Sequence, residues 1–445
     1  MVENNFISTP NLRKVLNPSK VLRPTKQPTN RLNMKLHRPL VEAVVIALTD
    51  IFKNNKYADK VVENTLRSNP KWGARDRAFI AETIYNCVRH LRLYNYLRTG
   101  DEKFIVADFK RKDFTEIAGI DLILRGAEPE SFPEFKGLSR ENILTRRENA
   151  SVLSSTTRHS IPDWLQAQGE KELGIEVFEK EITALNRQAD VVLRCNTLKI
   201  TVADLQKKLS DIGWQSHTTP LTPDALVLEK RGNITATELF KSGLFEVQDA
   251  GSQLIAPFLQ VEAGMFVIDA CAGAGGKSIH LGTLMRNSGK IISMDTEIRK
   301  LEELKKRAGR NGIKCIETKE VKTWLLEAKN KNSKIQLADR LLLDVPCSGL
   351  GVLRRNPDTK WKLTPKFLEE IKITQQNILQ DYSKMLKPGG KLVYATCSIL
   401  PSENQEQVKF FLKNNPNFEL GTERVVSPND DGFDGFYMAR IWKRL

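Results

Sequence analysis

Short apolar segments alternate with helix-like segments from about residue 260 to the end of the chain, and this alternation limits its possible folds more than any other feature. Thr364 and Pro365 suit the N-cap and first position of a long helix that ends before Pro388. Such alternation builds a parallel sheet with helices on both faces, and ligands bind at the carboxyl ends of its strands. Residues 259–445 are therefore predicted to form a Rossmann-like α/β domain. Its expected strands are 266–271, 290–295, 314–318, 340–344 and 391–397.

Three further segments precede this domain. Residues 1–33 are rich in Lys, Arg and Pro, which predicts a disordered basic tail, and Met34 is an alternative start. Residues 34–155 are predicted to be helical, with only a few helical turns joined by loops after residue 100. Residues 156–258 contain the expected strands 191–196 and 225–228, with a helix between Thr201 and Gly213, which indicates a small α/β platform.

The clearest helix of the N-terminal part is predicted from about Arg75 to Leu97. Its apolar residues recur at helical spacing and form one stripe: Ile80, Ile84, Val88 and Leu91. Arginines lie off that stripe: Arg75, Arg77, Arg89, Arg92 and Arg98. Two interpretations remain open for them, a solvated basic face or a surface that contacts RNA.

The formal net charge of +15 and the pI of about 9.4 favour a polyanionic partner, although a merely basic enzyme has the same composition. No apolar run reaches the length of roughly 18 residues that spans a bilayer, and no signal peptide is recognised, so a cytoplasmic protein without a membrane partner is expected. The six cysteines form no C-x-x-C pair and no zinc-like spacing with histidine. We therefore expect free thiols and no metal.

A glycine-rich turn, D-A-C-A-G-A-G-G-K at residues 269–277, stands between a predicted strand and a helix. Its glycines allow close approach of a ligand to the backbone, and the start of the helix attracts an anionic group. The next strand ends in Asp295, which can accept hydrogen bonds from both hydroxyls of a ribose. A dinucleotide-binding site would have the motif G-x-G-x-x-G, which is absent from this turn. S-adenosylmethionine, which has a carboxylate and a ribose but no pyrophosphate, suits the shorter turn; a purely structural glycine turn is the alternative.

Two cysteines follow strands of the same sheet. Cys347 lies in D-V-P-C-S-G (344–349), and Cys397 lies in A-T-C-S (395–398). An isolated cysteine is usually a packing residue. Here two cysteines follow two strands at the edge of the sheet that also carries the glycine-rich turn. This arrangement favours a catalytic role for them.

A cysteine pair suits methylation of cytosine. Carbon 5 of cytosine is a poor nucleophile, but a thiolate that adds to carbon 6 makes carbon 5 able to attack a sulfonium methyl group. An acid near nitrogen 3 must balance the charge that builds on the ring, and Asp344 is predicted to do so if it is protonated or shares a proton. A second sulfur can assist release of the first.

These motifs, in this order and spacing, resemble the RsmB/Sun family of RNA cytosine-5 methyltransferases over about residues 35–99 and 160–445. The resemblance implies a class I methyltransferase domain with a seven-stranded, mostly parallel sheet. It also implies that Cys397 is the nucleophile and that Cys347 assists release.

The resemblance implies a cofactor site as well. S-adenosylmethionine would be held by Asp295, Asp344 and the glycine turn, with Glu320 beside the adenine and Glu317 as the second candidate. Family members have A-P where this chain has Gly273-Ala274, which loosens the turn without abolishing binding. The turn residues implied are Cys271, Ala272, Gly273, Ala274, Gly275, Gly276 and Lys277.

The flanking segments resemble other parts of the family. L-R-C-N-T-L-K (193–199) and F-E-V-Q-D-A-G-S-Q (245–253) are similar to segments of an RRM-like platform, and D-G-F (434–436) to the closing hairpin of the sheet. W-G-A-R-D-R-A-F-I-A-E-T-I-Y (72–85) is similar to a NusB-type RNA-binding module, which favours 16S ribosomal RNA as substrate. We also expect the protein to be a monomer. The implied RNA contacts are Arg194, Gln248, Asp249 and Lys277.

Two other functions remain open. A DNA cytosine methyltransferase takes its nucleophile from the P-C motif and has no need of A-T-C-S, so Cys397 argues against it. A non-catalytic RNA-binding factor in ribosome assembly has no need of intact cysteines or of an intact glycine turn.

Overall fold

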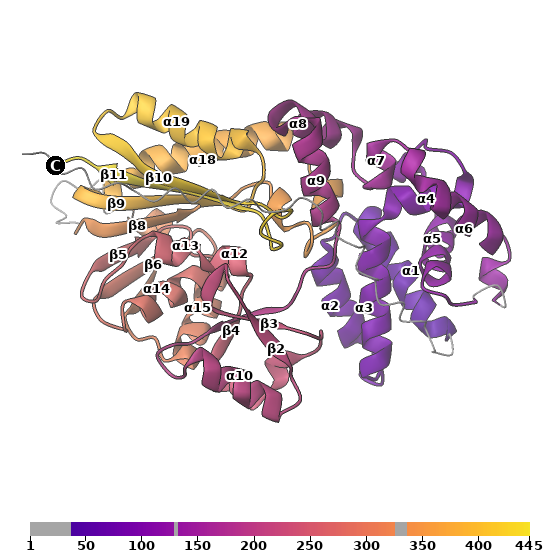
Figure 1. Ribbon diagram of the computed structural model, residues 1–445, viewed down its shortest axis with the longest axis horizontal. Coiled ribbons are helices and arrows are strands. Elements are labelled where there is room, and N and C mark those ends of the chain that lie inside the picture. Colours follow the sequence, from indigo (N-terminus) through magenta and orange to yellow (C-terminus); the bar gives the residue numbers. More distant parts are fainter. Residues whose placement is uncertain (1–36, 129–131, 325–335) are drawn as a thin grey trace, which may run out of the picture.

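The computed structural model describes residues 37–128, 132–324 and 336–445, so the predicted basic tail lies outside the described residues. Figure 1 shows a helical unit on the right, a large sheet with its helices on the left, and a small sheet below. Within the described ranges no helix combines the length and the apolar character needed to cross a bilayer.

The large sheet has seven strands in the order β10-β11-β9-β8-β5-β6-β7. The five strands β7, β6, β5, β8 and β9 pair in parallel, and β11 pairs antiparallel with both β9 and β10. This topology confirms the predicted Rossmann-like class. The strands are β5 (Phe266–Asp269), β6 (Lys290–Asp295), β7 (Ile316–Glu320), β8 (Ala338–Asp344), β9 (Leu386–Thr396), β10 (Phe418–Val426) and β11 (Phe436–Lys443).

Helices cover both faces of this sheet (Figure 1) because successive side chains of a strand point to opposite faces. Val267 of β5 packs with helices α13 and α14, whereas its neighbour Ile268 packs with α18 and α19. Both sides of the sheet are therefore apolar core. The main helices here are α13 (Ile255–Phe258), α14 (Gly276–Leu284), α15 (Ile298–Asn311), α18 (Pro365–Tyr382) and α19 (Gln405–Asn414).

The boundary between α18 and β9 differs from the prediction. Pro388, Gly389 and Gly390 were expected before the strand, yet they lie within β9, whose pairing with β8 shifts between Ala338 and Arg340. A bulge opposite Asp339 absorbs the extra residues, which is how a sheet accommodates glycine and proline.

The small sheet is antiparallel in the order β2-β3-β1-β4, and its β-α-β-β-α-β succession confirms the RRM-like platform. Thr201 caps α10 (Val202–Asp211) as predicted, and its hydroxyl accepts a hydrogen bond from the Asp204 amide at 3.1 Å. Strands β2 and β4 were missed because they are only four and three residues long, and β2 contains no apolar side chain of strand type. The strands are β1 (Val192–Cys195), β2 (Ser216–Thr219), β3 (Thr222–Leu228) and β4 (Phe245–Val247), and α11 (Glu238–Lys241) precedes β4.

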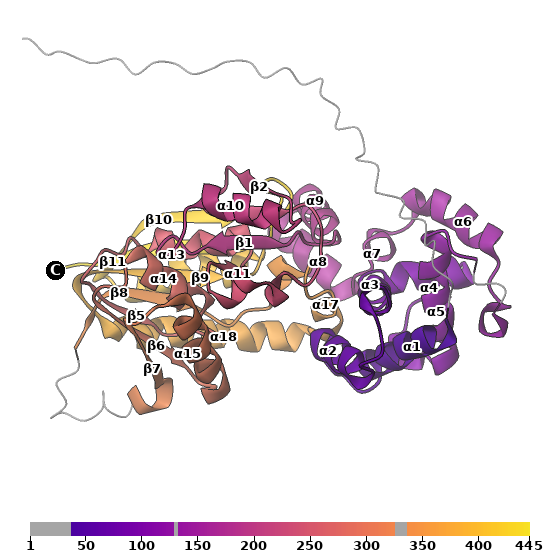
Figure 2. The ribbon, with the colours of Figure 1, turned by 90° about the horizontal axis from the view of Figure 1, so that it is seen from below.

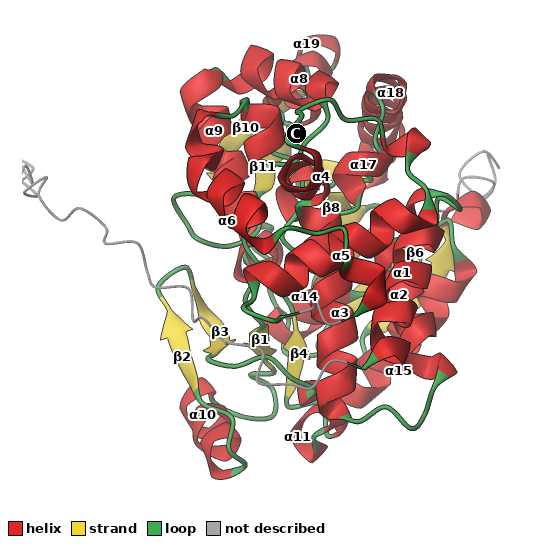
Figure 3. Cartoon of the chain, turned by 90° about the vertical axis from the view of Figure 1, so that its right-hand side faces the viewer, coloured by secondary structure: helices red, strands yellow, loops and turns green. Residues whose placement is uncertain are grey.

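The N-terminal unit is all helical, as predicted (Figure 3). The expected apolar stripe is fully buried, but the single predicted helix is two, with a break at His90. The helix α5 was missed because it is buried on most sides, with the acids Glu116 and Asp121 among its buried residues, and so has little amphipathic period. The helices are α1 (Arg38–Phe52), α2 (Ala58–Ser68), α3 (Ala74–Arg89), α4 (Leu91–Thr99), α5 (Arg111–Leu124), α6 (Arg140–Glu148) and α7 (Ser155–Arg158); α8 (Asp163–Leu173) and α9 (Ile175–Leu185) lead to the platform.

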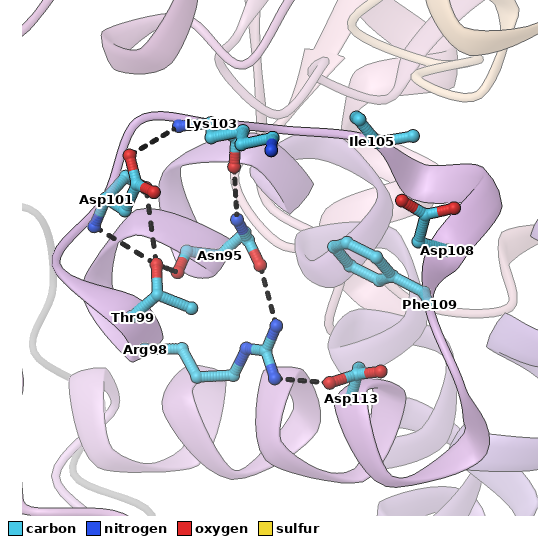
Figure 4. A pocket seen from close by; sticks show the side chains of 9 residues that line it. All are labelled: Asn95, Arg98, Thr99, Asp101, Lys103, Ile105, Asp108, Phe109 and Asp113. Carbon is cyan, nitrogen blue, oxygen red and sulfur yellow. Dashed lines mark hydrogen bonds and ion pairs between the residues drawn. The ribbon is translucent and has the colours of Figure 1, made fainter.

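The prediction that the arginines of α3 and α4 form an exposed basic face is wrong for three of them. Arg89 and Arg92 are only 4% and 8% exposed, and Arg98 forms ion pairs with Asp113 and Glu116. Figure 4 shows Arg98 reaching between Asn95 and Asp113 in a hollow of about 290 Å³. These arginines therefore contact other parts of the chain instead of water: Arg89 donates to backbone carbonyl oxygens, and Arg92 pairs with Asp163. Periodicity alone does not show whether a polar helix face meets water or another part of the chain.

The helical unit is joined to the α/β domain through α17 (Thr359–Lys362), which lies between them in Figure 2. The buried ammonium of Lys360 donates to the carbonyl oxygens of Arg89 at 2.8 Å and His159 at 3.3 Å, and to the amide oxygen of Asn186 at 3.1 Å. The Trp361 indole donates to the Val88 carbonyl at 2.8 Å. A single short segment thus links three parts of the chain.

We expect Lys360→Ala to lower the free energy of unfolding by about 2–4 kcal/mol, because three buried oxygens lose their shared donor. Urea titration followed by tryptophan fluorescence measures the change. Lys366→Ala, whose side chain is 86% exposed, is the matched control and should change stability by less than about 0.5 kcal/mol. Equal stability of the two variants would contradict a role for Lys360 at this junction.

Candidate active site

The glycine turn joins the end of β5 to the start of α14. Gly275 has a φ of +85°, and a Cβ atom on it would lie 2.4 Å from Cγ of Leu304 in α15. Gly273 has a φ of +53°, and no described atom lies within 4 Å of the position that its Cβ would take. Gly275 therefore lets two helices pack closely, while Gly273 leaves its side of the turn open to a ligand.

Asp295 lies at the end of β6, beside this turn. Its carboxylate accepts hydrogen bonds from the amides of Gly273 and Glu297, both at 2.9 Å. Glu320 is paired in register with Asp295 across β6 and β7, whereas Glu317 lies three residues earlier and forms an ion pair with Lys290. The placement of the two acids favours Glu320 over Glu317 for the predicted adenine contact.

Lys277 and Asp344 form an ion pair at the same rim of the sheet, with 2.5 Å between Nζ and Oδ2. Burial alone would lower the pKa of Lys277, but the charge and hydrogen bond of Asp344 outweigh it, so the pKa lies above its ordinary value. The charge of Cys397 contributes in the same direction. The lysine therefore stays protonated between the carboxylate and the cysteine.

The two predicted cysteines meet. Cys347 follows β8 and Cys397 follows β9, and their Sγ atoms lie 3.2 Å apart. The amide of Cys397 also donates to Sγ of Cys347 at 3.3 Å. The hydrogen bond to Cys397 and burial raise the pKa of Cys347 well above its ordinary value. The surroundings of Cys347 therefore favour its protonated form.

Backbone contacts that sequence reasoning missed support the Cys397 loop. The Gly351 amide donates to the Cys397 carbonyl, and the Gly435 amide donates to the Gly351 carbonyl, each at 2.8 Å. A Cβ on Gly351 would lie 2.2 Å from the Gly435 carbonyl oxygen. The sequence signal was the position of the two glycines: Gly351 stands two residues after P-C-S-G, and Gly435 stands inside D-G-F.

Two of the predicted RNA contacts are buried inside the protein. Arg194 is 3% exposed; it donates to the Gly276 carbonyl at 2.7 Å and to the side chain of Gln248. Burial lowers its pKa to about 10. Asp249 is 8% exposed and forms an ion pair with Arg355 at 2.8 Å. These residues join the platform to the α/β domain, and their contact with RNA stays a prediction.

The fold and this site define a Rossmann-like methyltransferase. Residues 256–443 match the family described as 16S rRNA methyltransferase RsmB/F, and residues 161–235 match the ferredoxin-like domain of RsmF/B-like methyltransferases. The chain is 31% identical over 449 residues to the probable ribosomal RNA small subunit methyltransferase B of Bacillus subtilis, with 89% of this chain and 97% of that protein covered. The chain therefore belongs to the RsmB/F family of methyltransferases.

Solved structures agree with this fold. The crystal structure of PH0851 has a TM-score of 0.75 at 21% identity and covers 92% of this chain and 100% of its own. A methyltransferase homologue from Pyrococcus horikoshii has a TM-score of 0.58 at 27% identity and covers 66% of this chain and 99% of its own.

We expect Gly275→Ala to destabilise the protein by about 1–3 kcal/mol, because alanine is strained at this positive φ and its Cβ would press on Leu304. The control is Gly309→Ala in α15, where the Cβ meets nothing within 4 Å and alanine favours the helix. Urea titration of both variants tests the assignment. A Gly275→Ala variant as stable as Gly309→Ala would refute the assignment.

Proposed function

We propose that the protein transfers a methyl group from S-adenosylmethionine to carbon 5 of a cytosine in 16S ribosomal RNA, with Cys397 as the covalent nucleophile. The observation that carries this proposal is the 3.2 Å contact between Cys347 and Cys397 beside the Lys277–Asp344 ion pair. The curated relatives are named as ribosomal RNA small subunit methyltransferases, which supports the choice of substrate.

The residues at the glycine turn fit S-adenosylmethionine. The open side of Gly273 leaves room for a ligand, and the first amides of α14 suit its carboxylate. Asp295 would accept from the ribose hydroxyls, and Glu320 would lie near the adenine. The other residues that would line the cofactor are Cys271, Ala272, Ala274, Gly275, Gly276, Lys277 and Asp344. The bound cofactor supplies an electrophilic methyl group on a sulfonium.

Cys397 would activate the base. Its sulfur forms a bond to carbon 6, and the displaced electron pair moves into the ring towards nitrogen 3 and carbon 5. Asp344, whose Oδ2 lies 2.5 Å from the ammonium of Lys277, would bind nitrogen 3 and pass it a proton from that lysine. Carbon 5 then carries the electron density needed to accept the methyl group.

Release would reverse the addition. After methyl transfer, carbon 5 loses its proton to water, and the electron pair of that bond forms the carbon 5–carbon 6 double bond. The sulfur–carbon 6 bond breaks with its electron pair returning to Cys397, and nitrogen 3 returns its proton to the Asp344–Lys277 pair. The thiol of Cys347, 3.2 Å from that sulfur, would stabilise the leaving thiolate by a hydrogen bond. The raised pKa of Cys347 keeps it in the form that can donate.

The excess of positive charge supports an RNA substrate, because phosphate contacts with Lys and Arg dominate such binding. We propose that the helical unit acts as a NusB-like RNA-binding module and that the monomeric protein works in the cytoplasm. Gln248 and Lys277 stay candidates for contact with the target region. Among the described residues no cluster of His, Cys, Asp and Glu is arranged to hold a metal ion.

The two cysteine variants should fail in different ways. Cys347→Ala can still add to the base, so it should accumulate RNA joined to Cys397. Denaturing electrophoresis after incubation with ribosomal RNA and cofactor should show a slow band that ribonuclease removes. Cys397→Ala should show neither the band nor turnover.

Other patterns identify the other functions. A band with Cys397→Ala and none with Cys347→Ala would make Cys347 the nucleophile, as in DNA cytosine methyltransferases. A wild-type protein without methyl transfer, together with no band for either variant, would indicate a non-catalytic RNA-binding factor.

A further inference from the structure

The two cysteine loops share one buried carboxylate. Glu403 lies after β9 in P-S-E-N and is 0% exposed. Its Oε1 accepts from the Ser348 amide at 2.8 Å and from the Gln375 amide group at 3.1 Å. Its Oε2 lies 2.5 Å from the hydroxyls of both Ser348 and Ser398.

These contacts tie the two motifs together through equivalent residues. Ser348 directly follows Cys347, and Ser398 directly follows Cys397, so one carboxylate oxygen holds the residue after each cysteine. The two hydroxyls are also 3.2 Å from one another. A shift of either loop would break a contact to the same carboxylate, so Glu403 links the position of one sulfur to that of the other.

Neighbouring residues hold Glu403 in place. The Tyr394 hydroxyl donates to the Glu403 carbonyl at 2.7 Å. Asn404 accepts from the Thr396 hydroxyl at 2.5 Å and donates to the Ser398 carbonyl at 2.9 Å. The residues on both sides of Cys397 are thus fixed to the segment that carries the carboxylate.

The groups around Glu403 are hydrogen-bond donors to its carboxylate. Two N–H groups and two hydroxyls point at its oxygens, which suits a carboxylate because a buried charge requires such donors. A negative charge here acts on the nearby thiols. It adds to the larger effects of Cys397 and of burial in raising the pKa of Cys347.

We propose that Glu403 is the positioning residue of the cysteine pair: its carboxylate holds the two loops in register, so that Cys397 is the sulfur presented to the base. Its negative charge also favours the protonated form of Cys347. This inference rests on the proposed covalent mechanism. Glu403 has no contact with the reacting atoms and acts only through Ser348, Ser398 and the field at Cys347.

Two substitutions separate the two parts of this role. Glu403→Gln keeps the shape and can still bond all four groups, because an amide oxygen accepts from the N–H groups and the hydroxyls can turn to accept from its NH₂. It removes only the charge. Glu403→Ala removes the link between the loops as well. Glu406→Gln is the matched control, since it removes an acid of the same segment that is exposed.

The first measurement needs neither RNA nor cofactor. Iodoacetamide alkylation of the full-length protein is followed against pH, and mass spectrometry resolves the peptides of Cys347 and Cys397. In the wild type and in Glu406→Gln, Cys397 should react at lower pH than Cys347. In Glu403→Gln, the midpoint for Cys347 should fall by at least about half a pH unit. An unmoved midpoint would overturn the proposed control of the proton.

The second measurement is methyl transfer to ribosomal RNA. Glu403→Gln should lower kcat about 10-fold, with KM for cofactor and RNA within 3-fold of wild type, and the loss should shrink at high pH. Glu403→Ala should lower kcat at least 100-fold. Turnover of both variants equal to Glu406→Gln would overturn the positioning role.

The experiments distinguish a failure of the covalent mechanism from a failure of the inference about Glu403. If Cys347→Ala traps no RNA, the covalent mechanism is wrong whatever Glu403 does. If the trapped complex forms as expected but the Glu403 variants match their control, the inference alone is wrong. Should Glu403→Ala fail to fold, the alkylation profile of the isosteric Glu403→Gln still decides.

Discussion

The parallel pairing of β8 with β9 is the constraint on which the rest of the site depends. Asp344 stands opposite Ala395 in that register, so the chains that leave the two strands emerge side by side. This places Cys347 next to Cys397 and puts Asp344 within reach of Lys277 from the neighbouring turn. The chemistry is built at the carboxyl edge because every functional loop there leaves a strand of fixed register.

The segment after Cys347 connects this edge to the rest of the molecule. Gly351 supports the Cys397 loop, Arg355 bonds Asp249 and Asp434, and Lys360 joins the helical unit. Burial beside Asp249 raises the pKa of Asp434 to about 6, so Arg355 is needed to balance two acids in one place. The helical unit and the platform are thus both held by the segment that follows Cys347.

Local signals explain what could be predicted from sequence. The strand–helix alternation, the glycine turn and the Thr364 cap depend on neighbouring residues, and the positions of Cys347 and Cys397 follow from strand ends. The role of Glu403 could not be predicted, because the sequence does not show whether an acid in a loop is buried or which donors surround it. The same limit applies to Arg89, whose partners are carbonyl oxygens more than 260 residues away.

The central claim is that carbon 5 of a cytosine is methylated through a bond to Cys397. The most direct test uses 16S ribosomal RNA transcribed with cytidine tritiated at carbon 5, incubated with the wild-type protein and cofactor carrying a ¹⁴C-labelled methyl group. The account predicts that tritium is released into water in step with methyl incorporation, and that Cys397→Ala abolishes both. Methyl incorporation without tritium release would contradict it.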